Sequence, residues 1–253
     1  QLLDLHENTV YFLNFGSSNI KKISYAASFA MDNYPNHLTA LLKQNLQRLS
    51  AISVRESTGI EICKQINIEA KLVLDPTLLI PKANYVSLIS KEKIITPYAY
   101  IYSLNIESAN EIKWFDVQQY CKSKNLKVIA TPSSGLVEGK ELFENANYDY
   151  ATIEGWLENI YYADIVFTTS FHGVIFSLIF HKKFIWFPIK GERGRGNNRV
   201  LDLLKILELE HHIYQEDKNN LEFDNLSTDW LKMEEKLNLL RIESIHFLTK
   251  NLQ

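Results

Sequence analysis

Short apolar segments alternate with segments of helical periodicity along most of the 253-residue chain. Eight segments are predicted to be β-strands because they are short and rich in β-branched and aromatic residues. They are 10–15, 21–28, 51–54, 71–74, 98–103, 127–131, 164–169 and 184–188. Segments such as DIVFTT (164–169) contain an uninterrupted apolar run, here residues 165–167, which is typical of strands buried on both faces of a parallel sheet.

Helices are predicted between several of these strands. Leucines recur at helical spacing over 36–49, Ser57 can cap a helix over 58–66, and a third helical pattern covers 107–123. Two more helices are expected to begin near Phe171 and after residue 199. Strands that alternate with helices predict an α/β fold with parallel sheets flanked by helices.

The prolines near the middle of the chain indicate a boundary between two domains. Pro76, Pro81 and Pro97 interrupt the pattern after VLDPTLLIP. We expect a partial N-terminal α/β domain over 1–90, a Rossmann-like domain over 91–225, and a C-terminal amphipathic helix over 226–253 that packs on the first domain. Strand-like sequence follows Gln1 almost at once, so we expect the first domain to be incomplete at its N-terminus.

Composition narrows the class of protein. The chain is 46% hydrophobic and 23% charged with a net charge of −3, which gives no electrostatic footprint for nucleic acid. Cys63 and Cys121 stand far apart, as suits a reducing cytoplasm. No apolar run reaches the ~18 residues of a membrane span. His211 and His212 are expected in polar surroundings, and no histidine pair has metal-ligand spacing, so no metal site is predicted.

The segment TTSFHGVIFSLIF (168–180) places a histidine where a buried strand turns into a helix. In open α/β sheets, ligands bind outside the carboxyl ends of strands, and a helix start favours an anion. Ser170, His172 and Gly173 are therefore candidates for binding an anion and transferring a proton. The alternative is a serine that caps the helix and a histidine that is hydrogen-bonded in the core.

A basic segment, KGERGRGNNR (190–199), follows the strand FIWFP. Its glycines predict a mobile loop, and Arg193, Arg195 and Arg199 can bind phosphate or carboxylate. Asn198, beside Arg199, is a further candidate ligand. The alternative is a solvated surface loop. The Gly-Lys-Ser/Thr ending of a Walker phosphate loop is absent.

The segments SVRE (53–56) and LDPT (74–77) also end strands. Arg55 is a candidate anion ligand, and Glu56 is a candidate substrate-binding residue. The alternative for Arg55 is a structural pair with a glutamate or with the helix dipole. Asp75 precedes Pro76, and an aspartate in that position usually forms a turn, so we expect Asp75 to have a structural role.

Six of these features occur in one order along the chain: KKISYAASF, ISVRES, VLDPTLL, ADIVFTTSFHGVIFSLIFHKKFI, NNRVLDLL and the C-terminal amphipathic helix. Together they resemble the polysaccharide pyruvyl transferase family. The resemblance covers essentially the whole chain, and its most specific part is TSFHGVIFSLIF.

The resemblance implies two Rossmann-like domains arranged as in GT-B glycosyltransferases. It implies an enzyme that transfers pyruvate from phosphoenolpyruvate to a sugar of a cell-surface polysaccharide or its precursor, forming a ketal. His172 would be the general acid or a donor to the phosphate, and Arg55 and Arg199 would bind the donor's anions from opposite sides. Ser170 and the Gly173 amide would add hydrogen bonds.

Under the same resemblance, Arg193 and Arg195 would belong to a closing loop, and Glu56 or Asp75 is a candidate carboxylate base. No tightly bound cofactor is indicated. We expect a cytoplasmic enzyme, with peripheral membrane contact if the acceptor is lipid-linked. Two other functions stay open: a GT-B glycosyltransferase that uses a nucleotide sugar, and a non-catalytic anion-binding domain.

Overall fold

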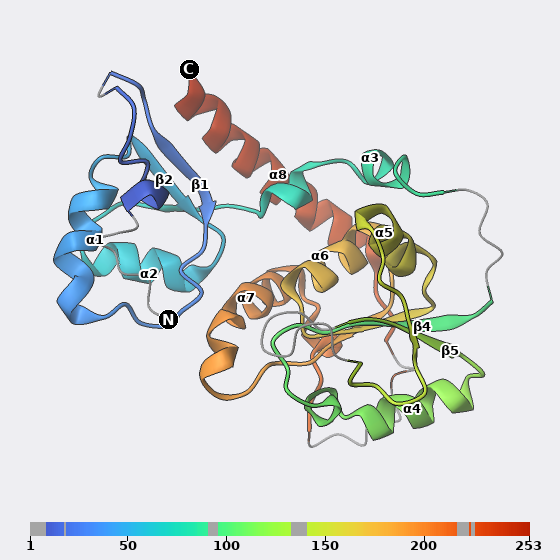
Figure 1. Cartoon of the computed structure of the whole chain (residues 1–253). Helices are drawn as coiled ribbons and strands as arrows, with labels where there is room; N and C mark the ends of the chain where they lie inside the picture. The colour runs from blue at the N-terminus through green and yellow to red at the C-terminus, as the bar shows by residue number, and fades with distance from the viewer. Residues whose placement is uncertain (1–8, 18, 91–95, 133–140, 217–222, 224–225) are drawn as a thin grey trace. The chain divides into compact units, whose positions relative to one another are not determined.

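The chain forms two compact units in a computed structural model that describes residues 9–17, 19–90, 96–132, 141–216, 223 and 226–253 (Figure 1). The first unit contains Gln1–Leu79 and Glu235–Gln253, and the second contains Ile80–Glu234. The sequence placed the corresponding limits at residues 90 and 225. Both units have parallel sheets, and a long helix ends the chain, so the predicted α/β class is confirmed.

The first unit is built on a parallel sheet with the strand order β1-β2-β3. The strands are β1 (Ile23–Ala27), β2 (Ala51–Val54) and β3 (Lys71–Leu72). Helices α1 (Thr39–Leu46) and α2 (Ser57–Gln65) pack with β2 through a core cluster. That cluster contains Leu42, Leu46, Ile52, Ile62, Cys63 and Ile66. Short 3₁₀ segments precede α1 at η2 (Asn36–Leu38) and follow β3 at η3 (Pro76–Leu79).

The C-terminal helix α8 (Trp230–Leu252) returns to the sheet of the first unit. The ring of Phe247 lies 6.3 Å from that of Tyr25 in β1. The Ser244 hydroxyl accepts a 3.0 Å hydrogen bond from the amide of Leu74, and Arg241 donates to the carbonyl of Leu78 at 2.7 Å. These polar contacts join the helix to the segment that follows β3.

The strand predicted over 10–15 is wrong. The structure has a 3₁₀ turn, η1 (Thr9–Phe12), followed by Leu13 in a left-handed conformation. Val10, Tyr11 and Phe15 are exposed. A short apolar run does not by itself distinguish a strand from a turn, and the positive φ of Leu13 ends any extended conformation there.

Within its described residues, the second unit contains five parallel strands in the order β6-β5-β4-β7-β8. Its strands are β4 (Tyr98–Tyr102), β5 (Lys127–Thr131), β6 (Asn147–Tyr148), β7 (Ile165–Thr168) and β8 (Phe184–Trp186). Alternate residues of β4 point to opposite faces, so Ala99 and Ile101 join one core cluster while Tyr100 faces the other side. Both faces are buried, as the apolar runs predicted.

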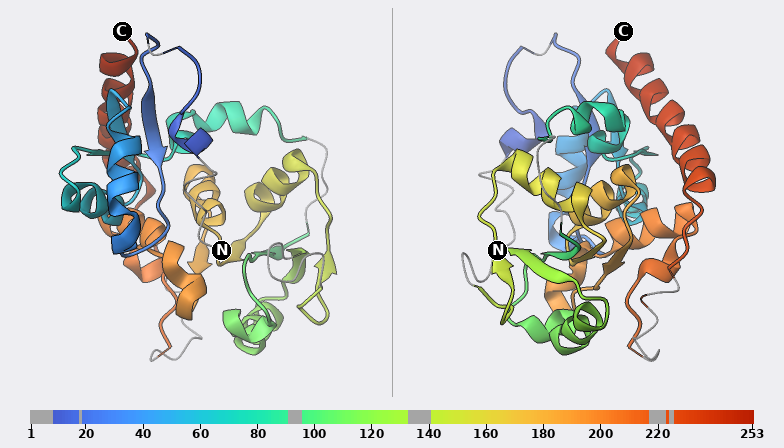
Figure 2. Two further views of the ribbon diagram at one scale, coloured as in Figure 1. Left: turned by 60° about the vertical axis from the view of Figure 1, so that its left-hand side comes forward. Right: turned by 90° about the vertical axis from the view of Figure 1, so that its right-hand side faces the viewer.

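Helices cover both faces of this sheet. Figures 1 and 2 show α4 on one face and α5 and α6 on the other. The helices of the second unit are α3 (Lys82–Val86), α4 (Trp114–Ser123), α5 (Ile153–Tyr162), α6 (Phe171–Phe180) and α7 (Asn198–Leu207). The single helix predicted over 107–123 is divided into η4 (Ala109–Ile112) and α4. Lys113 causes the division because its φ of 51° lies in the left-handed region.

Candidate functional site

The strand order of the second unit locates the place where ligands bind in open α/β sheets. From β4 the chain proceeds to β5 and β6 on one side, and then crosses to β7 and β8 on the other. This reversal is a topological switch point between β4 and β7. Tyr102 and Thr168 are register partners at the carboxyl ends of these two strands. The segment after β7, Thr169–Gly173, therefore begins at the switch point.

Two threonines connect the segments that leave β4 and β7. The Thr169 hydroxyl donates to the carbonyl of Leu104 at 2.9 Å and accepts from the amide of the same residue at 2.8 Å. The Thr168 hydroxyl donates to the carbonyl of Tyr102 and accepts from the amide of Ser170 at 3.0 Å. These four bonds fix the backbone just before α6. The sequence analysis assigned no role to either threonine. Two hydroxyl side chains at the end of a strand could have indicated that they bind neighbouring backbone groups.

Ser170 and Gly173 fix the start of α6. Ser170 is the N-cap, 4% exposed, and its hydroxyl accepts from the Gly173 amide at 3.3 Å. A side chain at Gly173 would overlap the Thr168 hydroxyl, so the first turn of α6 lies directly against β7. Both residues thus have structural roles here, and the Gly173 amide is already bonded to the cap.

His172 and Arg199 approach the same aromatic ring. The imidazole of His172 is exposed, and its centroid lies 5.4 Å from that of Phe171 at an angle of 69°. The guanidinium carbon of Arg199 lies over the same Phe171 ring, also at 5.4 Å, within range of a cation–π interaction. The structure therefore brings together two residues that the sequence assigned to anion binding, 27 positions apart in the chain.

The backbone of the basic segment positions Arg199. Its Nε donates to the carbonyl of Gly196 at 3.1 Å, and its guanidinium lies so close to Gly196 that a side chain there would overlap it. Gly196 ends η5 (Gly191–Gly196), so the segment predicted to be a mobile loop forms 3₁₀ turns. Asn198 and Arg199 then open α7, where both are partly buried.

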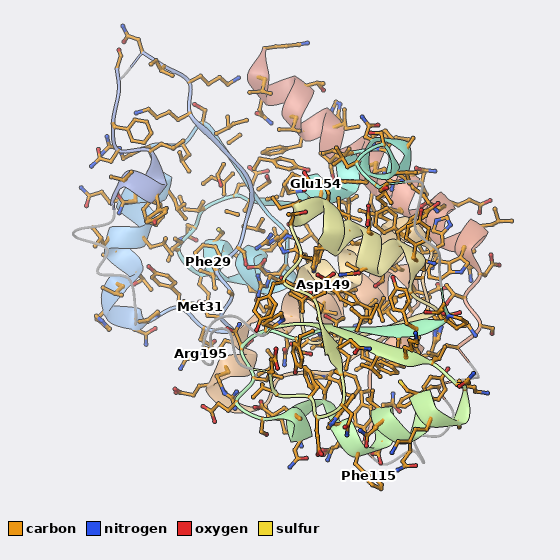
Figure 3. All side chains as sticks on the ribbon, turned by 45° about the vertical axis from the view of Figure 1, so that its right-hand side comes forward. Phe29, Met31, Phe115, Asp149, Glu154 and Arg195 are labelled. Atoms are coloured by element: carbon orange, nitrogen blue, oxygen red, sulfur yellow. The ribbon has the colours of Figure 1, made fainter. Side chains whose placement is uncertain are left out.

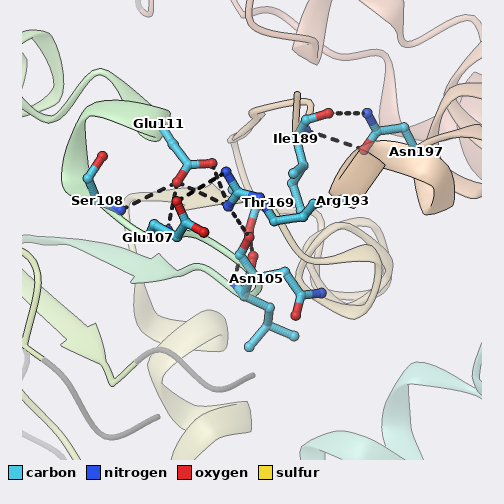
Figure 4. A network of polar contacts seen from close by, with 9 residues as sticks. Asn105, Glu107, Ser108, Glu111, Thr169, Ile189, Arg193 and Asn197 are labelled. Atoms are coloured by element: carbon cyan, nitrogen blue, oxygen red, sulfur yellow. Dashed lines mark hydrogen bonds and ion pairs between the residues drawn. The ribbon is translucent and has the colours of Figure 1, made fainter. Parts of the chain in front are cut away.

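The other arginines of this segment have acidic partners. Arg193 donates to the Asn105 carbonyl at 2.8 Å and forms an ion pair with Glu111 at 3.0 Å (Figure 4). Arg195, which is labelled in Figure 3, is exposed. It forms an ion pair with Glu192 at 2.9 Å. These contacts of Arg193 and Arg195 are thus with Asn105, Glu111 and Glu192 and not with the Phe171 ring.

Asn197, which the sequence analysis did not single out, connects the basic segment to the residues that follow β8. Its side-chain amide donates to the Ile189 carbonyl at 2.8 Å and accepts from the Ile189 amide at 3.3 Å (Figure 4). An asparagine amide is able to form both bonds at once. In the sequence, the pair of asparagines at 197 and 198 before the helical pattern could have indicated such a contact.

In the first unit, Arg55 forms an ion pair with Asp75, a partner that the sequence analysis did not assign to it. Asp75 is 3% exposed and also accepts from the amide and hydroxyl of Thr77 at 3.0 and 2.7 Å. Burial alone would raise the pKa of Asp75, but the bonds from Thr77 and Arg55 outweigh it and hold the pKa below its usual value. Asp75 is therefore ionised at neutral pH.

Glu56 holds the segment that follows β1. It is 1% exposed, and its Oε1 accepts from the amides of Phe29 and Ala30 at 2.6 and 3.3 Å. Glu56 also precedes α2 as its N-cap residue, where a negative charge is favourable. The observed contacts of Glu56 are those of a residue that positions a loop.

The expectation of polar surroundings for His212 is wrong. The side chain is fully buried and stacks on Phe184 with ring centroids 4.1 Å apart. It faces the Phe184 carbonyl and the Thr228 hydroxyl, each at 2.7 Å. Burial lowers the pKa of His212 to about 4, so the ring is neutral at pH 7. The polar sequence around His212 was misleading, because its neighbours Glu210 and His211 are exposed while the side chain of His212 itself lies in the core.

The two cysteines are buried thiols. Burial raises the pKa of Cys63 to about 11 and that of Cys121 to about 12. Both groups are therefore protonated at neutral pH and are poor nucleophiles. Within the described residues, no three or more His, Cys, Asp or Glu side chains group as metal ligands do. No described helix combines the length and apolarity needed to cross a membrane.

A family model for polysaccharide pyruvyl transferase matches residues 2–191 of this chain. A search of curated proteins found no match. Solved structures with a similar fold include a protein described as a UDP-N-acetylglucosamine 2-epimerase from Listeria monocytogenes, at 8% identity and a TM-score of 0.48. That match covers 87% of this chain and 61% of the epimerase, so the chain spans less than two thirds of that protein.

Two further structures show the same level of similarity. The UDP-GlcNAc 2-epimerase of Methanocaldococcus jannaschii is 12% identical with a TM-score of 0.47, over 87% of this chain and 68% of that one. The glycosyltransferase SnogD from Streptomyces nogalater is 12% identical with a TM-score of 0.37, over 86% and 60% of the two chains. Likenesses this distant say nothing about the substrate of the present chain.

Proposed function

Since this chain belongs to the polysaccharide pyruvyl transferase family, whose model matches residues 2–191, we propose that it transfers pyruvate from phosphoenolpyruvate to a sugar, forming a ketal. The acceptor is a sugar of a cell-surface polysaccharide or of its precursor. Phosphoenolpyruvate is a co-substrate that is consumed. We place the reaction in the cytoplasm, at the membrane surface where the acceptor is lipid-linked.

The proposed reaction needs one proton donor and binding groups for anions. Protonation of the methylene carbon of phosphoenolpyruvate makes the adjacent carbon electrophilic. One sugar hydroxyl adds to that carbon and loses its proton. The bond between the carbon and the phosphate oxygen then breaks, phosphate leaves with the bonding electrons, and the carbon becomes electrophilic again. A second hydroxyl adds there, loses its proton and closes the ketal, so the product keeps the methyl group and the carboxylate.

The observation that carries this proposal is the placement of His172 and Arg199 on the Phe171 ring at the switch point of the second unit. An exposed imidazole is able to donate a proton near neutral pH, and a guanidinium binds phosphate or carboxylate through paired hydrogen bonds. We assign His172 as the general acid or as a donor to the phosphate, and Arg199 as an anion ligand.

The other candidates have weaker support. Ser170 and Gly173 build the helix start on which His172 lies, and they act by positioning it. Arg55 stays a predicted anion ligand, although its ion pair with Asp75 gives it a structural role as well. Asn198 adjoins Arg199 and stays a predicted binding residue.

Two measurements test the proposal. The protein is incubated with phosphoenolpyruvate and a mixed glycan pool, and mass spectrometry detects a pyruvate adduct while phosphate release is followed in parallel. His172→Ala is expected to abolish both signals. His246→Ala, which changes an exposed histidine of α8, is the matched control and is expected to leave both unchanged. Normal turnover by His172→Ala would remove His172 from the mechanism.

A donor panel distinguishes the alternative functions. Release of a nucleoside diphosphate from nucleotide sugars, without use of phosphoenolpyruvate, would identify a glycosyltransferase. Binding of phosphoenolpyruvate without any turnover in the presence of the glycan pool would identify a non-catalytic anion-binding protein.

A further inference from the structure

A cavity of about 530 Å³ lies in the second unit, at the carboxyl edge of the sheet. Three segments line it: the 107–113 segment after β4, the 187–193 segment after β8, and residues 214–216. Its volume falls in the range of small-molecule sites. Because two of these segments follow the carboxyl ends of β4 and β8, the cavity adjoins the edge of the sheet where ligands bind in open α/β folds.

Aromatic and proline side chains form an apolar part of this cavity. Tyr214 stacks on Phe187 with ring centroids 4.8 Å apart and an interplanar angle of 26°. Phe187 is buried beneath it, and Pro188 lines the same cavity. A partly exposed tyrosine that rests on a buried ring presents a rigid flat surface with a polar edge.

The charged groups around this cavity balance one another. Among the described residues, three carboxylates and three cations line it. One oxygen of Glu216 accepts from Lys190 at 2.6 Å and lies 3.2 Å from Lys113. Arg193 lies 3.0 Å from Glu111 and 3.9 Å from Glu107 (Figure 4). The described lining of the cavity thus offers many hydrogen-bond donors and acceptors with equal numbers of positive and negative groups.

This combination fits a neutral polyhydroxylated ligand better than an anion. Hydroxyl groups both donate and accept, so they match a wall in which carboxylates and ammonium groups alternate. A sugar ring also has an apolar face that packs on an aromatic surface. A dianion such as phosphoenolpyruvate would gain little here, because each cation is already close to a carboxylate.

The cavity is linked to the His172 corner through η5. Arg193 in η5 contributes to the cavity wall, and the Gly196 carbonyl at the end of the same segment binds Arg199. A ligand in the cavity and an anion on Arg199 would therefore contact opposite ends of one short segment. We propose that this cavity binds a neutral sugar unit of the acceptor glycan, an inference that rests on the proposed function.

The test measures sugar binding directly, apart from catalysis. Saturation-transfer NMR uses the methyl glycosides of glucose, galactose, mannose and N-acetylglucosamine as probes with the whole chain. We expect at least one probe to bind, and Tyr214→Ala to weaken it roughly fivefold through loss of the aromatic surface. Tyr150→Ala, which removes an exposed tyrosine that does not line the cavity, is the matched control and should have no effect.

A second variant covers the case in which Tyr214→Ala does not fold. Glu216→Gln leaves Lys113 and Lys190 without their shared carboxylate, so glycoside binding should weaken and inorganic phosphate should begin to bind. Glu210→Gln, an exposed glutamate of η6 (Glu210–His212), is its control. Unchanged glycoside binding in both cavity variants, or binding of none of the four glycosides, overturns the inference.

Calorimetry with phosphoenolpyruvate separates this inference from the proposed function. We expect Tyr214→Ala to leave phosphoenolpyruvate binding unchanged. If it weakens phosphoenolpyruvate binding and not glycoside binding, the cavity belongs to the donor and the inference is wrong. If the protein binds glycosides through Tyr214 but does not bind phosphoenolpyruvate, the sugar site stands and the proposed function fails.

Discussion

The guanidinium of Arg199 lies 5.4 Å from the centre of the Phe171 ring, at the first residue of α6. Phe171 is 8% exposed and packed at the end of a buried strand, so it holds the arginine at a fixed place. The carbonyl of Gly196 holds the Nε of the same guanidinium. An arginine fixed at two points loses little conformational entropy when it binds an anion.

We expect Arg199→Gln to raise the KM for phosphoenolpyruvate or the Kd measured by calorimetry. A hydrogen bond to a charged group contributes about 1.5–3 kcal/mol, so the effect should be roughly 10- to 100-fold. Arg199→Lys should recover part of the loss because it keeps the charge but not the planar fork. Arg195→Gln, an exposed arginine paired with Glu192, is the control. Equal affinity in Arg199→Gln would show that this arginine does not bind the donor.

Gly173→Ala should destabilise the protein by about 1–3 kcal/mol, because the new methyl group would overlap the Thr168 hydroxyl and force α6 away from β7. Gly155→Ala is a matched control, since Gly155 is also the third residue of a helix and also donates to a capping hydroxyl, that of Thr152. A methyl group there meets Ala151 at 3.2 Å, a contact that a small shift relieves. Urea denaturation measures both; equal stability of the two variants would contradict the close packing at Gly173.

The strands buried on both faces were predictable from the sequence, because such strands leave continuous apolar runs. The segment 164–169 became β7 and 98–103 became β4 for this reason. Strand β6 has two residues, Asn147 and Tyr148, and among the described strands it pairs with β5 alone, so the sequence contains no apolar run that would predict it. Short elements at a sheet edge depend on their neighbours more than on their own residues.

Part of the candidate site was predictable from a rule about where ligands bind in α/β sheets, and not from apolar runs. The rule that ligands bind at the carboxyl ends of strands identified His172 from local sequence. The ion pair that engages Arg193 could not be predicted, because Glu111 lies 82 residues away and pairs through the fold. Sequence reasoning therefore identified the basic segment but not which of its arginines has acidic partners.

Asp75→Asn should destabilise the first unit by roughly 1–3 kcal/mol, because it leaves the Arg55 guanidinium without a buried carboxylate. The pKa of Asp75 lies below its usual value in the folded state. Its contribution to stability is therefore complete above the unfolded pKa near 3.8 and is lost as the pH falls through the folded value. Below about pH 4, the free energy of unfolding of Asp75→Asn, measured by urea denaturation, should accordingly depend less on pH than that of the unsubstituted protein. Asp229→Asn, in an exposed position before α8, is the control.

His212 should make the second unit less stable in mild acid. Its pKa is about 4 in the folded state against an ordinary value of 6.5, since burial disfavours the charged ring. The unfolded chain therefore binds a proton that the folded chain does not, and stability should fall as the pH drops from about 6.5 to about 4, by on the order of 3 kcal/mol. His212→Gln cannot titrate, and its side-chain amide keeps an N–H donor for the carbonyl of Phe184, so the free energy of unfolding of this variant should change less over this interval. Urea denaturation at pH 7 and pH 5 measures the difference, with His246→Gln as the exposed control. The same pH dependence in His212→Gln and in the unsubstituted protein would mean that folding does not lower the pKa of His212, which its place in the core argues against.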